Sequence, residues 1–366
     1  MNNKSINIFF LGDISLNDRY NNYFDKGLKP FEKVKDHLTN SDFVIGNLEC
    51  MSRGEDGENL LKKPRLKTDT QTLEFLKDFN LSIATLAHNH IYDNLESGFT
   101  NTIKKLNDLN IQYLGAGYSE DEAQKPLIIE RNGIKIAYIN YVTSDTNPNI
   151  PKDANIYLND FSIDRIIEDI IELKKIVDYV VCLFHWGGKV ENGMYPDFNQ
   201  PKIAYKIIDS GADLIIGHHS HTLQPYEVYK GKYIFYSLGN FCFSDIYSDD
   251  KLHEIDRESG CQSIILNIEF YKKNYKTSIQ HIENGNGFIL LNNSNKIKKE
   301  YNFRNKIFKI IKTKKYLWKI YWIKHKHYNP IKFYFFGNDK NSFTQLKLLS
   351  FKKVVNYILK KLKGKI

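Results

Sequence analysis

Five short apolar runs in the first 285 residues each lead into side chains that bind metals, and this alternation constrains the fold more than any other feature. The runs and the side chains at their ends are INIFFLG with Asp13, DFVIGN with Asn47 and Glu49, LSIATLA with Asn89 and His90, VDYVVCLF with His185, and ADLIIG with His219 and His221. Amphipathic stretches such as 95–109 separate the runs, which predicts βαβ units and a parallel sheet. The carboxyl ends of parallel strands meet at one edge, where ligands bind.

These side chains are typical ligands of a metal site at that edge. Imidazole nitrogen and carboxylate oxygen suit transition metals, and a hydrolytic site needs an open position for water. Each residue also has a structural alternative. Asp13 could belong to a turn, Glu49 could be a surface side chain, His185 could be a hydrogen-bonded core residue, and the histidine loop 218–221 could bind backbone groups.

Further apolar patterns extend the predicted sheet. The stretch 133–142 predicts another strand, and 226–238 and 262–280 alternate in the manner of antiparallel strands. The chain contains no internal repeat.

Composition indicates a globular chain of 366 residues, 42% of them hydrophobic, which is enough for a large core. The four cysteines lie far apart without CxxC spacing, so neither a structural zinc site nor a disulfide framework is predicted. The amino-terminal segment has about six consecutive apolar residues, too few for a signal peptide or a membrane span. We therefore expect a cytoplasmic protein without a transmembrane segment.

The basic charge is concentrated at the carboxyl end. Residues 296–366 contain 21 of the 52 basic residues and two of the 43 acidic ones, a net charge of +19, which leaves −10 for 1–295. We expect two domains, 1–290 and a basic, aromatic-rich, helical extension 296–366. Amphipathic helices are predicted around 307–320 and at 351–366.

This extension has three interpretations. Its lysines and aromatic side chains suit peripheral contact with an anionic membrane at its inner face. They also suit an acidic cell-surface polymer or a phosphorylated precursor. The third interpretation is a set of helices packed on the first domain. The sequence contains no nucleic-acid-binding motif, so a nucleic-acid partner is not expected.

Seven motifs in order resemble the capsule-synthesis CapA family, which is associated with poly-γ-glutamate production within the metallophosphoesterase (calcineurin-like) superfamily. They span about 6–270 and read FLGDISL, DFVIGNLE, LAHNHIYD, IQYLGAGYSEDEAQKPLIIERNGIKIAYI, FHWGG, GADLIIGHHSHTLQP and FYSLGNFCF.

The resemblance implies a four-layer α/β/β/α metallophosphoesterase-like sandwich that binds one or two divalent ions, Mn, Fe or Zn. The metal-site candidates are Asp13, Asn47, Glu49, Asn89, His90, His185, His219 and His221. The catalytic candidates are His90, His185 and Glu191. Ser237 and Asn240, candidates for substrate binding, would lie on a loop beside the site, or in a turn that follows the strand KYIFY. Arg65 could bind an anionic substrate, or it could belong to a solvated basic loop.

The sequence departs from the family pattern at several positions. Ser15 stands where metallophosphoesterases carry the histidine of an Asp-x-His pair, which removes one imidazole ligand. Lys189 stands near the place of an acidic residue, and Glu191 follows two positions later. Asn94, rather than glycine, follows Asp93.

These observations support two hypotheses from different classes. The first is a CapA-like metal-dependent phosphoesterase or hydrolase that serves capsule or other cell-surface polymer synthesis. The second is a non-catalytic accessory subunit that binds polymer, membrane surface or synthase partners. A peptidase acting on γ-glutamyl bonds is a weaker third hypothesis, because no separate nucleophile is evident.

Overall fold

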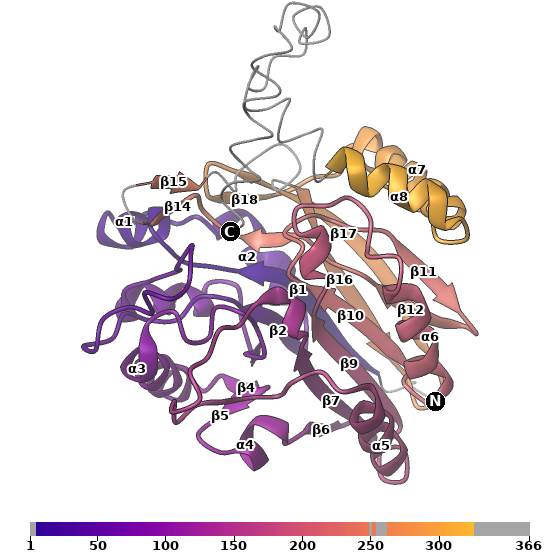
Figure 1. Ribbon diagram of the computed structural model, residues 1–366, viewed down its shortest axis with the longest axis horizontal. Coiled ribbons are helices and arrows are strands. Elements are labelled where there is room, and N and C mark those ends of the chain that lie inside the picture. Colours follow the sequence, from indigo (N-terminus) through magenta and orange to yellow (C-terminus); the bar gives the residue numbers. More distant parts are fainter. Residues whose placement is uncertain (1–4, 249–250, 254–261, 326–366) are drawn as a thin grey trace, which may run out of the picture. The chain divides into compact units, whose positions relative to one another are not determined.

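The computed structural model describes residues 5–248, 251–253 and 262–325. The chain divides into two compact units, Met1–Lys312 and Thr313–Ile366. The first unit contains two large sheets whose faces pack together, and helices cover both outer faces (Figure 1).

The first sheet combines a parallel half and an antiparallel half. Its order is β18-β17-β16-β1-β2-β3-β4, with β13 also paired to β1. Strands β1 to β4 and β13 run parallel, whereas β16, β17 and β18 are antiparallel. The strands are β1 (Ile6–Ile14), β2 (Phe43–Leu48), β3 (Ile83–Thr85), β4 (Gln112–Leu114), β13 (Asn240–Cys242), β16 (Gln262–Phe270), β17 (Tyr275–Gly285) and β18 (Phe288–Leu291).

The second sheet has the order β11-β12-β10-β9-β7-β6, with four parallel strands between two antiparallel edges. Its strands are β6 (Leu127–Arg131), β7 (Ile134–Val142), β9 (Tyr179–His185), β10 (Leu214–His218), β11 (Tyr226–Tyr229) and β12 (Lys232–Phe235). Two small sheets pair β5 (Ala116–Gly117) with β8 (Tyr157–Leu158), and β14 (Ile246–Ser248) with β15 (Lys251–His253).

Helices flank the two sheets and connect their strands. The α-helices are α1 (Arg19–Asp25), α2 (Glu32–Leu38), α3 (Leu95–Asp108), α4 (Glu120–Gln124), α5 (Ile163–Leu173), α6 (Gln200–Asp209), α7 (Asn295–Ile311) and α8 (Lys315–Ile323). The 3₁₀ helices are η1 (Thr70–Lys77), η2 (Ser144–Thr146) and η3 (Gly188–Val190).

The period-two alternation of the strands explains the four layers. In β1, Ile8 and Phe10 enter the core between the sheets, whereas Phe9 and Leu11 face the helices α1, α2 and α3. Strand β9 alternates in the same way between the central core and the helices α5 and α6. Successive strand residues point to opposite faces, so near-continuous apolar runs supply two core layers at once. The predicted four-layer sandwich is therefore confirmed.

Two further sequence predictions are confirmed in outline. The alternating stretches near 226–238 and 262–280 form the antiparallel pairs β11–β12 and β16–β17. The helix predicted over 95–109 is α3. The predicted helix at 351–366 lies outside the described residues. Among the residues that the structure describes, no helix is long and apolar enough to cross a membrane.

The first unit ends at Lys312, one helix later than the boundary predicted at 290–296. Helix α7 belongs to the sandwich because Tyr301 enters the central core and Phe308 enters the core beneath α5 and α6. The Tyr301 hydroxyl donates to the Gln224 carbonyl at 3.1 Å. The lysine-rich composition of α7 conceals this apolar anchor, since the lysines occupy its other faces.

The anchoring of α7 can be tested at Phe308, which is 2% exposed. We expect Phe308→Ala to lower the free energy of unfolding by about 3 kcal/mol, because it leaves a cavity in a packed core. Urea denaturation measures this change. The matched control is Phe303→Ala on the same helix, where the side chain is 63% exposed; this change should stay within about 0.5 kcal/mol. Equal effects at the two positions would contradict the docking of α7.

Candidate metal centre

Strand pairing in the first sheet brings three polar side chains to one level. Asp13 in β1 lies opposite Asn47 in β2 and opposite Asn240 in β13. The approach to β13 requires glycine at position 12, where an added Cβ would lie 1.8 Å from the Gly239 carbonyl oxygen. The parallel register therefore fixes the first carboxylate beside two amides before any loop contributes.

Asn47 connects the carboxylates to the second sheet. Its Nδ2 donates to Asp13 Oδ1 at 2.9 Å and to Glu49 Oε2 at 3.4 Å, and it lies 3.3 Å from His185 Nδ1. Its Oδ1 accepts from the Thr85 hydroxyl at 3.2 Å. The amide thus holds Asp13 and Glu49 in fixed orientations at the strand ends.

The second sheet supplies the histidines from the ends of two adjacent parallel strands. His185 ends β9 and lies opposite His218 at the end of β10. His185 Nε2 is 2.9 Å from Asn89 Oδ1, 3.0 Å from His219 Nδ1 and 3.6 Å from Glu49 Oε1. The ring of His185 therefore contacts residues from both sheets.

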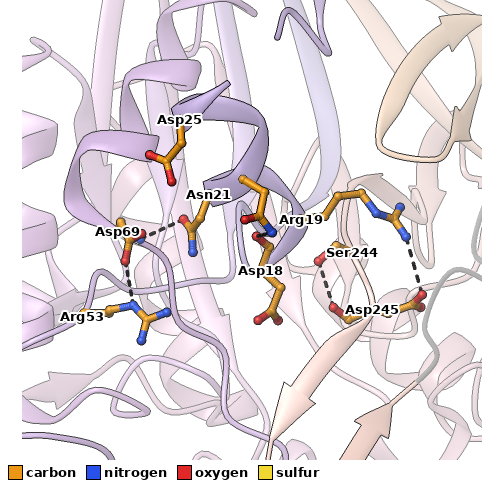
Figure 2. A pocket seen from close by; sticks show the side chains of 9 residues that line it. Asp18, Arg19, Asn21, Asp25, Arg53, Asp69, Ser244 and Asp245 are labelled. Atoms are coloured by element: carbon orange, nitrogen blue, oxygen red, sulfur yellow. Dashed lines mark hydrogen bonds and ion pairs between the residues drawn. The ribbon is translucent and has the colours of Figure 1, made fainter. Parts of the chain in front are cut away.

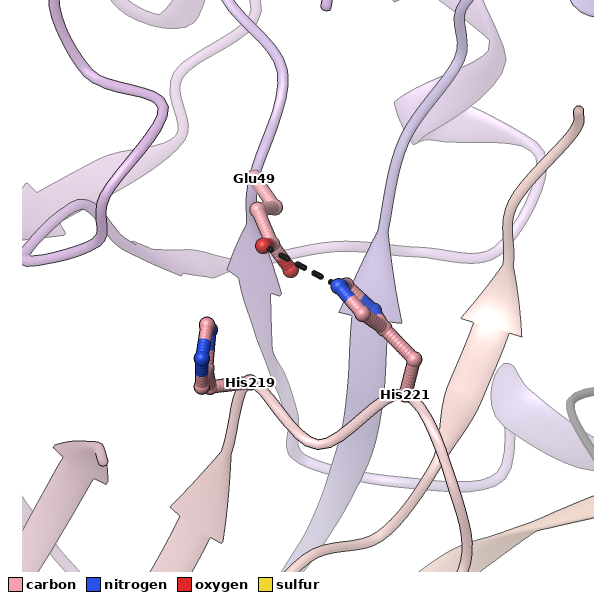
Figure 3. Close-up of side chains that lie close together, drawn as sticks. All are labelled: Glu49, His219 and His221. Atoms are coloured by element: carbon pink, nitrogen blue, oxygen red, sulfur yellow. Dashed lines mark ion pairs between the residues drawn. The ribbon is translucent and has the colours of Figure 1, made fainter. Parts of the chain in front are cut away.

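The histidine loop after β10 turns two imidazoles toward Glu49 (Figure 3). His219 has φ of 88° and His221 has φ of 55°, a backbone conformation that is uncommon for residues other than glycine. His221 Nδ1 lies 3.0 Å from Asn240 Oδ1, and its Nε2 lies 3.7 Å from Glu49 Oε1. His219 and His221 therefore lie on the same side of this loop, next to Glu49.

Two overlapping groups of side chains have the spacing that a metal ion requires. Glu49, His219 and His221 form one group, and Asp13, Glu49 and His185 form the other, with ligand atoms within 4.8 Å of one another in each. In the part of the chain that the structure describes, Glu49 Oε1 and His219 Nε2 are buried without a hydrogen-bond partner. Buried polar atoms normally have partners, so these two atoms fit ligands of a cation.

The carboxylates have opposite electrostatic tendencies. Burial and the neighbouring Asp13 raise the pKa of Glu49 well above its ordinary value. Burial alone would raise the pKa of Asp13 as well, but the hydrogen bond and charge of His218 lower it. Two buried carboxylates in one cluster form a pair that a divalent cation would neutralise.

Burial favours the neutral, metal-binding form of His185 and His219. Burial lowers the pKa of His219 to about 4. Burial, reinforced by His219 and His88, lowers the pKa of His185 well below its ordinary value. Since a metal competes with protons for imidazole nitrogen, these shifts favour ligation at neutral pH.

A cavity of about 180 Å³ opens beside this cluster. It is lined by Lys62, Lys63, Pro64, Asn89, His90, Asp145, Thr146, Asn147, Gly188, Glu191, His219, His221, Phe243 and Ile246. Burial alone would raise the pKa of Glu191, but His219 and His221 lower it. The Asn192 N–H donates to the Ser220 carbonyl at 2.8 Å, which ties the Glu191 segment to the histidine loop.

A buried lysine that the sequence analysis missed lies in the cavity wall. Lys62 Nζ is 3.2 Å from Asp93 Oδ1 and donates to the Asn89 carbonyl. Asp93 Oδ2 is 2.5 Å from His90 Nδ1, so one carboxylate pairs with a lysine and a histidine. Lys62 stands three residues before Arg65, and the basic pattern of this segment was its only signal in the sequence.

The substrate-binding candidates occupy different places. Asn240 contacts His221 and is part of the cluster. The Ser237 hydroxyl accepts from the Gly239 N–H at 3.1 Å and so shapes the adjacent turn. Arg65 is buried and donates to Glu58 at 2.8 Å and to the Lys62 carbonyl, and it does not line the cavity.

A larger polar cavity, of about 540 Å³, lies near α1 (Figure 2). Both of its arginines form ion pairs: Arg53 with Asp69 at 2.7 Å, and Arg19 with Asp245 at 3.6 Å. None of the predicted site residues lines it. The smaller cavity beside Glu49 is therefore the candidate functional site.

The fold and the cluster together define a class: a four-layer α/β/β/α protein with a buried histidine and carboxylate site where both sheets end. Residues 7–245, more than half of the chain, match the family described as bacterial capsule synthesis protein PGA_cap. The chain belongs to this family. The match includes every predicted site residue and excludes α7 and the second unit.

Two relatives carry related names. The chain is 34% identical over 224 residues to the PGA biosynthesis protein CapA of Bacillus subtilis (strain 168), covering 58% of this chain and 56% of that protein. It is 31% identical over 228 residues to the capsule biosynthesis protein CapA of Bacillus anthracis, covering 60% and 55%. The aligned region thus spans about half the length of these curated relatives.

Among solved structures, the NAD nucleotidase of Haemophilus influenzae is similar with 15% sequence identity and a TM-score of 0.47. The alignment covers 82% of this chain and 62% of that one. At this level of similarity, the assignment of the fold depends on the sheets and layers described above.

The charge network at Lys62 gives a prediction about stability. We expect Asp93→Asn to destabilise the protein by about 3–5 kcal/mol, because it leaves a buried ammonium without its carboxylate. The double variant Lys62→Met/Asp93→Asn should be destabilised by less than the sum of the single changes, with a coupling of about 1–3 kcal/mol.

Urea denaturation of the four proteins in this cycle measures the coupling. Asp153→Asn, at an exposed position, serves as the control and should be neutral within about 0.5 kcal/mol. Strictly additive single and double variants would show that Lys62 and Asp93 do not interact.

Proposed function

We propose that this protein is a metal-dependent hydrolase of the phosphoesterase type that serves the synthesis of a capsule or a poly-γ-glutamate-type polymer. One observation carries the proposal: two ligand groups share Glu49, and the buried Glu49 Oε1 and His219 Nε2 have no hydrogen-bond partner in the described part of the chain. The family of the chain and the names of its relatives supply the biological context.

The donor set fits one or two divalent cations. The proposed ligands are Asp13, Asn47, Glu49, Asn89, His90, His185, His219 and His221. Mixed nitrogen and carboxylate oxygen donors suit Mn, Fe or Zn better than Mg or Ca. When bound, such a cation supplies Lewis acidity and positive charge for an anionic substrate. Because Glu49 belongs to both ligand groups, it would contribute to holding a cation at either one.

The replacement of the Asp-x-His histidine by Ser15 does not leave Asp13 without an imidazole. The Ser15 hydroxyl is buried and donates to Asn17 Oδ1 at 2.7 Å. His218 Nδ1 lies 3.3 Å from Asp13 Oδ1, on the side of the second sheet. We therefore add His218 to the candidate ligands beside Asp13. The sequence analysis had not assigned it to the site.

His90 and Glu191 line the cavity and are the two candidates for proton transfer to a leaving group. Asp93, whose pKa is lowered by His90 and Lys62 despite burial, accepts from His90 Nδ1. This contact places the proton of neutral His90 on Nδ1 and the lone pair on Nε2. Glu191 lines the same cavity and is the group that remains for this step when His90 Nε2 binds a cation.

The wall of the cavity supports an anionic substrate. The Lys62 ammonium is buried beside Asn89 and His90, where it would attract a phosphoryl or carboxylate group more strongly than an exposed lysine. A phosphorylated precursor or an anionic cell-surface polymer is the substrate class that we propose, with its reacting group in this cavity. The hydrogen bond of Asn240 to His221 then serves to orient a metal ligand.

Metal content is the first test of the proposal. We expect the protein, purified without oxygen and chelators, to carry at least about one Mn, Fe or Zn per chain. The double variant His219→Ala/His221→Ala should lose at least about 90% of this content, because it removes two of the three ligands in one group. Elemental analysis by mass spectrometry measures the stoichiometry.

His37→Gln is the matched control, since His37 on α2 stacks on Phe9 outside the cluster; its metal content should equal that of the wild type. Wild-type protein that remains free of transition metal would leave the accessory-subunit hypothesis in place of the enzyme.

Activity is the second test. We expect metal-loaded protein to hydrolyse a phosphodiester or phosphomonoester in a p-nitrophenyl panel, and Glu191→Gln to lower kcat about 10²–10⁴-fold if Glu191 transfers the proton. His90→Gln tests the alternative group. Lys189→Gln, at an exposed position two residues before Glu191, should leave kcat unchanged. A metal-loaded protein inactive on every phosphoester would contradict the proposed reaction.

A further inference from the structure

Helix α8 presents an apolar face to solvent. None of its nine residues, KYLWKIYWI, is buried. Tyr316, Ile320 and Ile323 are 59%, 61% and 54% exposed. Their spacing of i, i+4 and i+7 places them on one side of the helix. A helix in water normally turns such a stripe toward a core, so the exposed stripe indicates a partner.

Lysines flank this apolar face. Lys319 and Lys324 are exposed. At about 100° per residue, Lys319 projects about 100° to one side of Ile320 and Lys324 about 40° to the other side. Lys314 and Lys315 begin the helix, and residues 313–325 contain no aspartate or glutamate. An apolar centre bordered by long cationic side chains is the pattern of a helix that lies in an interface.

The whole second unit shares this composition. Residues 313–366 contain 14 lysines and one acidic residue, Asp339, a net charge of +13, together with 12 aromatic residues. The remaining 312 residues carry 38 basic and 42 acidic residues, a net charge of −4. The positive charge of this protein therefore resides in the unit that contains α8, outside the region matched by the family.

The apolar side chains decide between the two anionic partners that such charge could bind. A hydrophilic polyanion would engage the lysines but would leave Tyr316, Ile320 and Ile323 in water. A bilayer with anionic headgroups offers phosphates for the lysines and an apolar boundary for these three side chains. The combination on α8 matches the bilayer.

We propose that α8 attaches this protein to an anionic lipid surface. The face of α8 formed by Tyr316, Ile320 and Ile323 enters the headgroup boundary, and Lys315, Lys319 and Lys324 contact lipid phosphates. The attachment that we propose is peripheral, with α8 lying in the headgroup boundary. It is independent of the chemistry proposed at Glu49.

Vesicle cosedimentation of the full-length protein tests this attachment. We expect binding to phosphatidylcholine vesicles with about 30% phosphatidylglycerol to be at least about tenfold stronger than to phosphatidylcholine alone. Raising the salt from about 50 to about 500 mM should weaken it, because screening removes the attraction. A chain that ends at Lys312, the boundary of the first unit, should not bind.

Two double variants with equal charge changes separate insertion from simple attraction. Ile320→Glu/Ile323→Glu should lower the partition coefficient at least about tenfold relative to Ile171→Glu/Ile176→Glu. Ile171 and Ile176 are 47% and 60% exposed on the first unit, so the control tolerates the same substitutions. Thermal unfolding of each variant confirms that the first unit remains folded.

Three results would overturn the proposal. The first is no binding to anionic vesicles at low salt. The second is equal binding by the chain that ends at Lys312. The third is equal binding by the two double variants, accompanied by tighter binding of the full-length protein to soluble polyglutamate than to vesicles. That last result would identify a polyanion as the partner of the second unit.

Discussion

Two carboxylates, Asp13 and Glu49, are fully buried in one cluster. The side chains at the ends of the strands are arranged so that they can stabilise these two groups. An unpaired charge in a protein interior costs several kcal/mol. Asn47 donates to both groups, and His218 and His221 lie within 3.5 Å of Asp13. These contacts offset part of the cost of burying the charges. The raised pKa of Glu49, caused by burial and by Asp13, shows that the offset is incomplete. A cation bound here would neutralise the negative charge that these neighbours do not compensate.

Strand pairing positions five of the side chains in this cluster. Asp13, Asn47 and Asn240 are in register on three adjacent strands, and His185 and His218 are in register on two more. Parallel pairing fixes such positions within a sheet, and the packing of the two sheets then brings their edges together. Only the histidine loop has to adopt an uncommon conformation, at His219 and His221. A site assembled on rigid strands keeps its donors aligned without help from a ligand.

The sequence located donors at and just after the strand ends, including His219 and His221 on their loop, but missed His218 at the end of β10 and Lys62 on a loop. The apolar runs located Asp13, Asn47 and His185, because a buried strand must end where its run ends. Lys62 and Arg65 share one basic loop, and nothing in its pattern shows that Lys62 reaches the cavity while Arg65 pairs with Glu58. Tertiary contacts such as the Asn59 N–H to the Asp93 carbonyl set the path of that loop. Helix α7 matches the interpretation of helices packed on the first domain, since two of its aromatic residues are buried there despite its lysines.

The net charge around the cavity relates the proposed metal site to the proposed anionic substrate. Asp13, Glu49, Asp93 and Glu191 contribute four carboxylates, while Lys62 contributes one ammonium, and burial holds His185 and His219 neutral. With all four carboxylates ionised the local charge is −3, which repels a phosphoryl or carboxylate group. Two divalent cations would change it to +1, and the same cavity would then attract that group. Under the proposed function, an anionic substrate would therefore bind in this cavity more strongly once the cations are bound.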